Sequence, residues 1–187
     1  MPLPPAAPRK LVHTREVRCL GFERDDGLWD IEGTITDVKA YSFENQDRGT
    51  IAAGTPLHEM RVRVTVDDNL VVKDIAAVTE YSPFTICPDV AGGVKSLIGE
   101  RIAAGWTKIV LEKMGGTAGC THIMQLILGP LATTVFQTVQ PALNRRRREA
   151  GIKEDPTKKP GLLDTCYGWS SANAMVKKRF PAFYTGS

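Results

Sequence analysis

The chain has 187 residues, 42% of them hydrophobic, and a formal net charge of +3 at pH 7. That is enough apolar material for one sizeable core, and nothing in the composition requires a second domain. The basic runs lie in the C-terminal part and lack interleaved aromatic residues, so we expect no nucleic-acid binding. The proline-rich start is unlike a signal peptide and no apolar run has membrane-spanning length, so we expect a cytoplasmic protein without membrane association.

The chain is expected to form three regions. Residues 1–10 are predicted to be a flexible N-terminal arm and residues 11–150 a single α+β domain. Residues 151–187 have the composition of a linker followed by a segment that docks on the body or on a partner subunit. Four scattered cysteines in a reducing compartment are expected to be free thiols or metal ligands.

The first part of the domain is predicted to be a β-hairpin. Residues 12–22 and 28–43 favour strands, and the Asp-Gly pair at 26–27 predicts a two-residue loop. That register places Glu23 opposite Asp30. Because like charges directly opposite each other destabilise a hairpin, either the register is shifted or the carboxylates have another partner.

Two carboxylates share one face of the second strand. Asp30 and Glu32 are two residues apart, so they point the same way and could act as general acid and base on a ligand. The alternative interpretation is an ordinary solvated polar face.

The next strand has a clear alternation of side chains. From residue 57 to 66, His58 and the apolar residues at 60, 62, 64 and 66 point one way, which places His58 on the core face at the end of the strand. Residues 44–53 are polar and predict a loop, and a further strand is expected at 70–79. The pattern predicts an antiparallel meander sheet of about four strands, with helices covering one face.

Helical spacing follows the strands. A helix is predicted at about 90–103, a short one at 106–114, and a long one from Ile123 onwards that Gly129-Pro130 must kink. Cys87 stands just ahead of the first helix, where the dipole favours thiolate; a buried small apolar side chain is the alternative.

A candidate metal site combines four residues at the ends of predicted elements: His58, Cys87, Cys120 and His122. Such ends can converge at one rim of a sheet, and two thiolates with two imidazoles suit tetrahedral zinc, or iron. The spacing does not match a zinc finger.

Part of the chain resembles iron–sulfur cluster assembly scaffolds of the NifU/IscU-like type. The likeness rests on residues 54–64, 68–74 and 96–99, with Cys87 and Cys120. The resemblance implies a NifU/IscU-like fold in which Cys87 and Cys120 match the scaffold's second and third cysteines and His58 takes the place of the first. His122 follows its cysteine, whereas the scaffold's histidine precedes it. The implied function is that of a metal or iron–sulfur carrier acting through a partner.

Nearly the whole chain resembles a bacterial family, domain of unknown function 2889. The motifs are residues 24–33, Gly105-Trp106 and residues 119–122. The family name states no activity. Relatives of this type are associated with bacterial breakdown of lignin-derived aromatics, including lyases that release a one-carbon fragment.

These features favour a small-molecule enzyme, and the chain carries no nucleotide-binding or flavin motif. We expect a lyase that cleaves a C–C or C–O bond of a phenolic lignin-derived aromatic, releasing formaldehyde or CO2 by acid–base or metal-assisted chemistry. His58 is the expected proton-transfer group or ligand, and a homo-oligomer is a further expectation. Arg15, Trp29 and Tyr81 are expected to hold the aromatic anion. The alternatives are the carrier and an interaction module whose Cys and His residues only pack.

Overall fold

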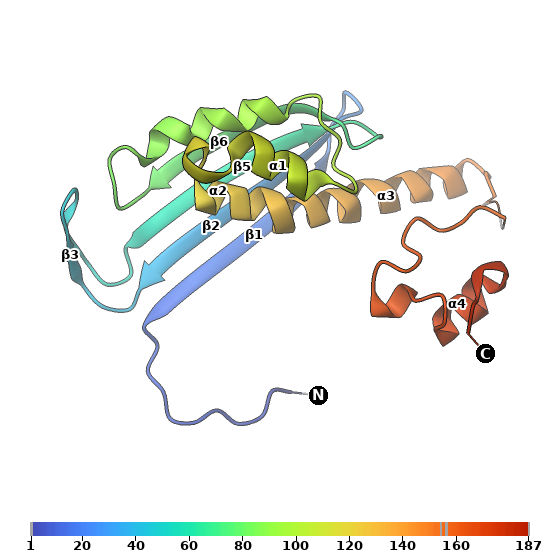
Figure 1. Cartoon of the computed structure of the whole chain (residues 1–187), viewed down its shortest axis with the longest axis horizontal. Coiled ribbons are helices and arrows are strands. Elements are labelled where there is room, and N and C mark those ends of the chain that lie inside the picture. The colour runs from blue at the N-terminus through green and yellow to red at the C-terminus, as the bar shows by residue number, and fades with distance from the viewer. Residues whose placement is uncertain (1, 154, 156, 187) are drawn as a thin grey trace. The chain divides into compact units, whose positions relative to one another are not determined.

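The structure, a computed structural model, describes residues 2–153, 155 and 157–186 (Figure 1). The chain divides into two compact units, Met1–Leu143 and Asn144–Ser187. The four positions outside the described residues include the first residue of the expected N-terminal arm, two residues of the expected linker and the last residue of the chain.

The first unit is built on a four-stranded sheet with the order β1-β2-β5-β6, in which every neighbouring pair is antiparallel. The strands are β1 (His13–Glu23), β2 (Trp29–Lys39), β5 (Pro56–Val66) and β6 (Val72–Tyr81). The helices lie on one face of this sheet (Figure 1). The predicted α+β meander with one covered face is therefore confirmed.

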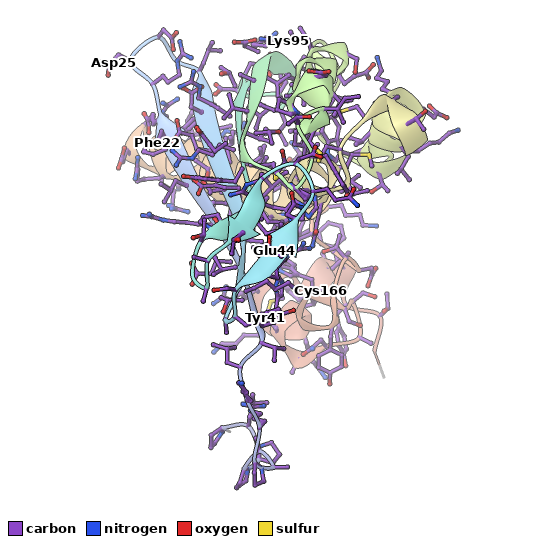
Figure 2. The ribbon with its side chains drawn as sticks, turned by 90° about the vertical axis from the view of Figure 1, so that its left-hand side faces the viewer. Phe22, Asp25, Tyr41, Glu44, Lys95 and Cys166 are labelled. Atoms are coloured by element: carbon purple, nitrogen blue, oxygen red, sulfur yellow. The ribbon has the colours of Figure 1, made fainter. Side chains whose placement is uncertain are left out.

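The β1–β2 hairpin has a register one residue away from the predicted one. Glu23 lies opposite Trp29 and not opposite Asp30, so the unfavourable carboxylate pair does not form. The loop has three residues, 25–27, and the residues that flank it share a backbone hydrogen bond. Gly27 has a positive φ of 83°, the conformation that closes three-residue hairpin loops with a bulge. Asp25 lies at the tip of this hairpin in Figure 2.

The predicted loop at 44–53 is wrong. This segment contains a second, two-stranded sheet made of β3 (Phe43–Asn45) and β4 (Gly49–Ile51). The carboxamide oxygen of Asn45 accepts two hydrogen bonds from backbone N–H groups of the turn, so a polar side chain closes a hairpin that composition alone presents as a loop. Glu44 marks this hairpin in Figure 2.

The regular helix predicted at 90–103 is also wrong. A series of 3-10 turns, η1 (Cys87–Leu97), packs against β6. It ends just before Gly99, which has a φ of 88°, and the chain then forms a bridge between Val71 and Arg101. A left-handed glycine and a return to the sheet leave no room for a longer helix.

The remaining helices of the first unit lie near their predicted positions. The short helix α1 is Trp106–Met114, as predicted, and a 3-10 turn, η2 (Gly116–Ala118), follows it. The long helix is interrupted near the predicted place: α2 (Thr121–Leu126) leads into a π-helical segment, η3 (Ile127–Leu131), and then into α3 (Ala132–Glu149). Proline within η3 has no N–H to donate, which favours such a wider turn.

The core lies between the sheet and the helices. Its largest fully buried side chains are Trp29, Ile31, Ile35, Met60, Ile75, Leu97, Met114, Ile123, Leu126 and Leu131. Gly33 lets the side chain of Leu131 approach β2 closely. A cavity of about 10 Å³ in this layer is too small for a ligand. The core is a packed interior without room for a ligand, so a functional site must lie at its edge.

The helical segment Thr121–Glu149 has 29 residues, and an 18-residue window of it has a mean hydropathy of 1.2, so by length and composition alone it could cross a membrane. Its apolar positions Ile123, Leu126, Val135 and Val139 are buried in the core of the first unit. Packing against the sheet therefore accounts for these apolar positions.

The second unit contains the end of α3 and three short elements. These are the 3-10 turns η4 (Tyr167–Trp169) and η5 (Pro181–Phe183), and the helix α4 (Ala174–Arg179). The side chain of Asn173 caps α4 by accepting a hydrogen bond from the backbone N–H of Met175.

Candidate functional site

A buried carboxylate continues the apolar face of β2. Alternate residues of this strand, Trp29, Ile31 and Ile35, are fully buried toward the helices. Asp37 is the next residue on that face, and only 1% of it is exposed. A charge at a core position is costly unless it is paired and hydrogen-bonded, so its partners define the candidate site.

Neighbouring strands place a partner on each side of Asp37. Arg15 lies directly opposite on β1 and donates from Nε to Oδ1 and from Nη2 to Oδ2, both at 2.7 Å. The Nη1 of Arg15 donates to Gln125 at 2.8 Å. His58 lies directly opposite on β5, with Nδ1 3.3 Å from Oδ2 of Asp37. Asp37 is thus the middle of a row across three strands.

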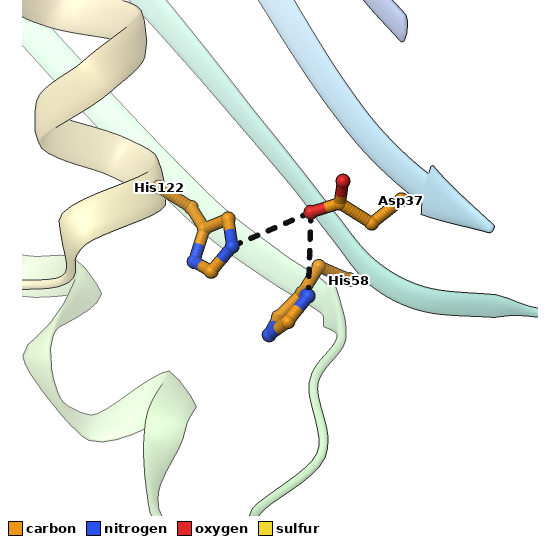
Figure 3. Close-up of side chains that lie close together, drawn as sticks. All are labelled: Asp37, His58 and His122. Atoms are coloured by element: carbon orange, nitrogen blue, oxygen red, sulfur yellow. Dashed lines mark ion pairs between the residues drawn. The ribbon is translucent and has the colours of Figure 1, made fainter. Parts of the chain in front are cut away.

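The helical layer supplies a further imidazole. His122, in the first turn of α2, places Nε2 3.4 Å from the same Oδ2 of Asp37 (Figure 3). The rings of His58 and His122 stack with centroids 3.9 Å apart and planes inclined by 28°. His13 of β1 approaches the other oxygen, with Nε2 3.0 Å from Oδ1. The chain has three histidines, and all three meet this one carboxylate.

A thiol stands on the far side of His122. The Sγ of Cys120 is 3.9 Å from Nδ1 of His122, the ring nitrogen that does not face Asp37. Burial raises the pKa of Cys120, but the hydrogen bond with His122 and the nearby backbone N–H groups lower it more, so the net shift is downward. Cys120 therefore contacts the imidazole from outside the group formed with Asp37.

The charges of the site are set by burial and by Arg15. Burial raises the pKa of Asp37, yet the hydrogen bonds and charge of Arg15 outweigh this and leave it below its ordinary value. Burial, and then the neighbouring His122, lower the pKa of His58 to about 4. His58 is consequently a neutral imidazole at pH 7. Its Nδ1 is buried and has no hydrogen-bond partner among the described residues.

Asp37, His58 and His122 form a group that could hold a metal ion. Each offers one ligand atom, and these atoms lie within 4.8 Å of one another. Two imidazoles and a carboxylate are a common ligand set for zinc and for iron.

The structure brings together some of the residues expected from the sequence. His58 and His122 are stacked, Cys120 is adjacent to His122, and Arg15 belongs to the site. Neither Cys87 nor Cys120 belongs to the metal-capable group among the described residues. The donors of Arg15 bond to Asp37 and Gln125, which is a different arrangement from the expected binding of an aromatic anion.

Four of the expected residues lie elsewhere. Asp30 and Glu32 point to the uncovered face of β2, where Asp30 accepts from Thr65 and Glu32 lies 3.7 Å from Arg63. Trp29 is 1% exposed and donates its indole N–H to Asp68, so its ring is not open to a ligand. Tyr81 is partly exposed at the end of β6, and the guanidinium of Arg48 lies 5.3 Å from its ring centre.

Sequence reasoning missed Asp37, His13 and Gln125. A signal for Asp37 was present, because the alternation of Trp29, Ile31 and Ile35 places residue 37 on the core face. His13 and Gln125 carry no comparable signal in the sequence, since their place depends on the β1–β2 register and on the docking of α2.

Comparison with known proteins identifies a family. The family model described as a protein of unknown function (DUF2889) matches residues 13–137, a region that contains every residue of the site. No curated protein and no solved structure matches the chain, so the NifU/IscU-like resemblance finds no support there. With two thirds of its length matched, the chain belongs to the DUF2889 family.

Proposed function

We propose that the chain is a small-molecule enzyme whose active site is the Asp37 group. The observation that carries this proposal is the convergence of all three histidines on one buried carboxylate from β1, β5 and α2. A buried ion pair with surrounding imidazoles adds little to stability compared with apolar packing. Clusters of titratable groups with shifted pKa values are typical of active sites.

The proposed reaction is that of a lyase on a phenolic lignin-derived aromatic, as the family resemblance implies. The phenolate first expels a group from the benzylic carbon, with its bonding pair, and forms a quinone methide. An imidazole of the His58–His122 pair then removes the proton of a side-chain hydroxymethyl group. The C–C bond to that group breaks and formaldehyde leaves. The bonding pair forms the alkene, the quinone methide electrons restore the aromatic phenolate, and the protonated imidazole gives its proton to the expelled group. The sequence is redox-neutral and needs no nucleotide cofactor.

Asp37 supports this chemistry by orienting the imidazoles. A carboxylate next to an imidazole fixes the ring orientation and stabilises the protonated form during transfer. Arg15 in turn holds Asp37 ionised and in place. We assign Arg15 to positioning and not to substrate binding, because three of its five N–H donors already bond to Asp37 and Gln125.

The test is release of formaldehyde, or of CO2, from a panel of phenolic dimers with a hydroxymethyl or carboxyl side chain. Wild-type protein is expected to release the fragment and to form the matching alkene. His58→Gln and His122→Gln should lower the rate by about 10²-fold or more. Glu32→Gln, on the uncovered face, is the matched control and should retain the rate. Absence of turnover across the panel, or wild-type rates in both histidine variants, would reject the proposal.

The second candidate is a metal carrier acting through a partner, which the metal-capable group favours. A carrier should hold metal in stoichiometric amount and transfer it without turnover of any aromatic. An iron–sulfur scaffold is less well supported, because the group contains no cysteine. We also place the protein in the cytoplasm, in keeping with the free state of all four cysteines.

A further inference from the structure

We propose that Asp37, His58 and His122 bind one zinc ion with three protein ligands and one open position. The inference deepens the proposed function and rests on it only for the role of the open position. With both imidazoles as ligands, a zinc-bound hydroxide in that position would take the hydroxymethyl proton in place of an imidazole. The ligand atoms are Oδ2 of Asp37, Nδ1 of His58 and Nε2 of His122.

The two distances from the carboxylate oxygen to the imidazole nitrogens suit a tetrahedral ion. Zinc bonds of about 2.0–2.1 Å at tetrahedral angles place ligand atoms about 3.3 Å apart. The carboxylate oxygen lies 3.3 Å from the nitrogen of His58 and 3.4 Å from that of His122. An octahedral ion with bonds of similar length would hold adjacent ligands about 3.0 Å apart, so the spacing favours zinc over magnesium.

The ligand atoms also have the right bonding capacity. Nδ1 of His58 is buried and has no hydrogen-bond partner among the described residues, although it faces a carboxylate oxygen. A nitrogen and a carboxylate oxygen that bind the same ion would lie this close without a hydrogen bond between them. Oδ2 of Asp37 has two lone pairs, of which Arg15 uses one, so one remains for a metal. Metal-bound carboxylates commonly accept a second hydrogen bond of this kind.

Cys120 is excluded from the ligand set by its position. Its Sγ contacts Nδ1 of His122, whereas Nε2 of the same ring faces Asp37. The two nitrogens of one imidazole point in different directions. An ion bound by Nε2 is therefore out of reach of a thiol that lies beside Nδ1. Cys120 is therefore a positioning residue that orients His122. Three protein ligands leave the fourth zinc position for water or for an oxygen of the substrate, such as a phenolate.

Metal content tests the site directly. The full chain should be purified without a polyhistidine tag and without chelators, dialysed, and analysed by mass spectrometry of elements. About one zinc per chain is expected for wild type and for Cys120→Ala and Cys87→Ala. His58→Gln and His122→Gln should each lose it while circular dichroism shows a native fold. Wild type without stoichiometric zinc, and without a rise in Tm when zinc is added, would overturn the proposal.

Cobalt substitution tests the ligand set. Co²⁺ in a site of two nitrogens and one oxygen should show visible d–d bands of tetrahedral intensity and no thiolate-to-cobalt charge-transfer band in the near ultraviolet. A charge-transfer band that disappears in Cys87→Ala or Cys120→Ala would overturn the assignment in favour of a cysteine ligand. Should either histidine variant fail to fold, this spectrum of the wild type still shows whether a tetrahedral site forms and whether a cysteine is a ligand.

The two proposals fail in different ways. Turnover of a phenolic dimer by wild type that purifies without zinc, and whose Tm does not rise when zinc is added, would reject the zinc site and keep the enzyme. One zinc per chain with no turnover of the panel would reject the lyase and keep the zinc site.

Discussion

The imidazoles of His58 and His122 lie face to face, 3.9 Å between centroids, and direct one nitrogen each to the same oxygen of Asp37. One ring comes from the end of a strand and the other from the start of a helix. Their stacking therefore depends on how α2 docks on the sheet. A change that moves this helix relative to β5 should separate the rings before it unfolds the domain.

The first prediction concerns the pair of Arg15 and Asp37. Arg15→Met should destabilise the protein by about 2 kcal/mol, because it leaves a buried carboxylate without its cation. The effect is no larger because one end of Arg15 is in contact with solvent, which weakens the ion pair. Urea unfolding measures the change. The double variant Arg15→Met/Asp37→Asn is the control and should be more stable than Arg15→Met alone, since its buried group is neutral. Equal stability of the two variants would contradict a charge-pair role.

The second prediction concerns the contact of β1 with α3. A Cβ at Gly21 would overlap the side chain of Thr138, so Gly21→Ala should destabilise by about 1–3 kcal/mol. Thermal unfolding measures the loss. Adding Thr138→Ala should recover part of the loss, because the two overlapping outer atoms are then absent. A tolerated Gly21→Ala would mean that α3 does not pack this closely on β1.

The third prediction concerns acid stability at the β5–β6 turn. Burial raises the pKa of Asp67, but the hydrogen bond from Lys73 and the N–H groups of Val71 and Asn69 lower it more, so the net pKa lies below 3.8. A carboxyl with a lowered folded pKa stabilises the protein above its unfolded pKa, and this contribution is lost as the pH falls through the folded value. The stability gap between wild type and Asp67→Asn should be full at pH 7 and shrink below about pH 4.

Urea unfolding between pH 7 and pH 2.5 checks this prediction. Lys73→Met is the matched control, because it removes the 2.8 Å ion pair and keeps the bonds of Asp67 to the backbone. The stability difference between wild type and Lys73→Met should therefore be smaller than that between wild type and Asp67→Asn. A gap that stays constant over the range would show that Asp67 titrates alike in the folded and unfolded chains.

The fourth prediction concerns Trp29. Its indole N–H donates to Asp68 at 2.9 Å and the ring is buried, so Trp29→Phe should reduce stability by about 1 kcal/mol or more through lost packing and the lost hydrogen bond. In an Asp68→Ala background the same substitution should cost less. If the site binds an aromatic ligand, its Kd should be the same for folded Trp29→Phe and wild type. A large change in Kd would return Trp29 to the binding site.

Local patterns predicted much of the fold. The alternation from His58 to Val66 placed His58 on the core face, and helical spacing gave the bounds of α1. The hairpin register was wrong by one residue, because Gly27 closes a three-residue loop and not a two-residue one. A one-residue shift moves side chains to the other face of the sheet.

That shift explains why the pairing of Arg15 with Asp37 was missed. In the predicted register Arg15 lies opposite Val38, whereas in the structure it lies opposite Asp37. The cysteines were expected to share the rim with the imidazoles. Whether a side chain at the end of one element reaches another depends on helix docking, and the sequence of neither element contains that information.

The π-helical segment η3 joins α2 to α3 and sets the rotation of α2 about the helix axis relative to α3. Val135 and Val139 are fixed in the core on one side of it, and His122 lies on the other side. Each residue of an α-helix turns the chain by about 100°. Removing one residue from η3 would keep the C-terminal half seated while turning His122 away from Asp37 by about that angle, so the spacing of this short stretch sets the direction of an imidazole several residues before it.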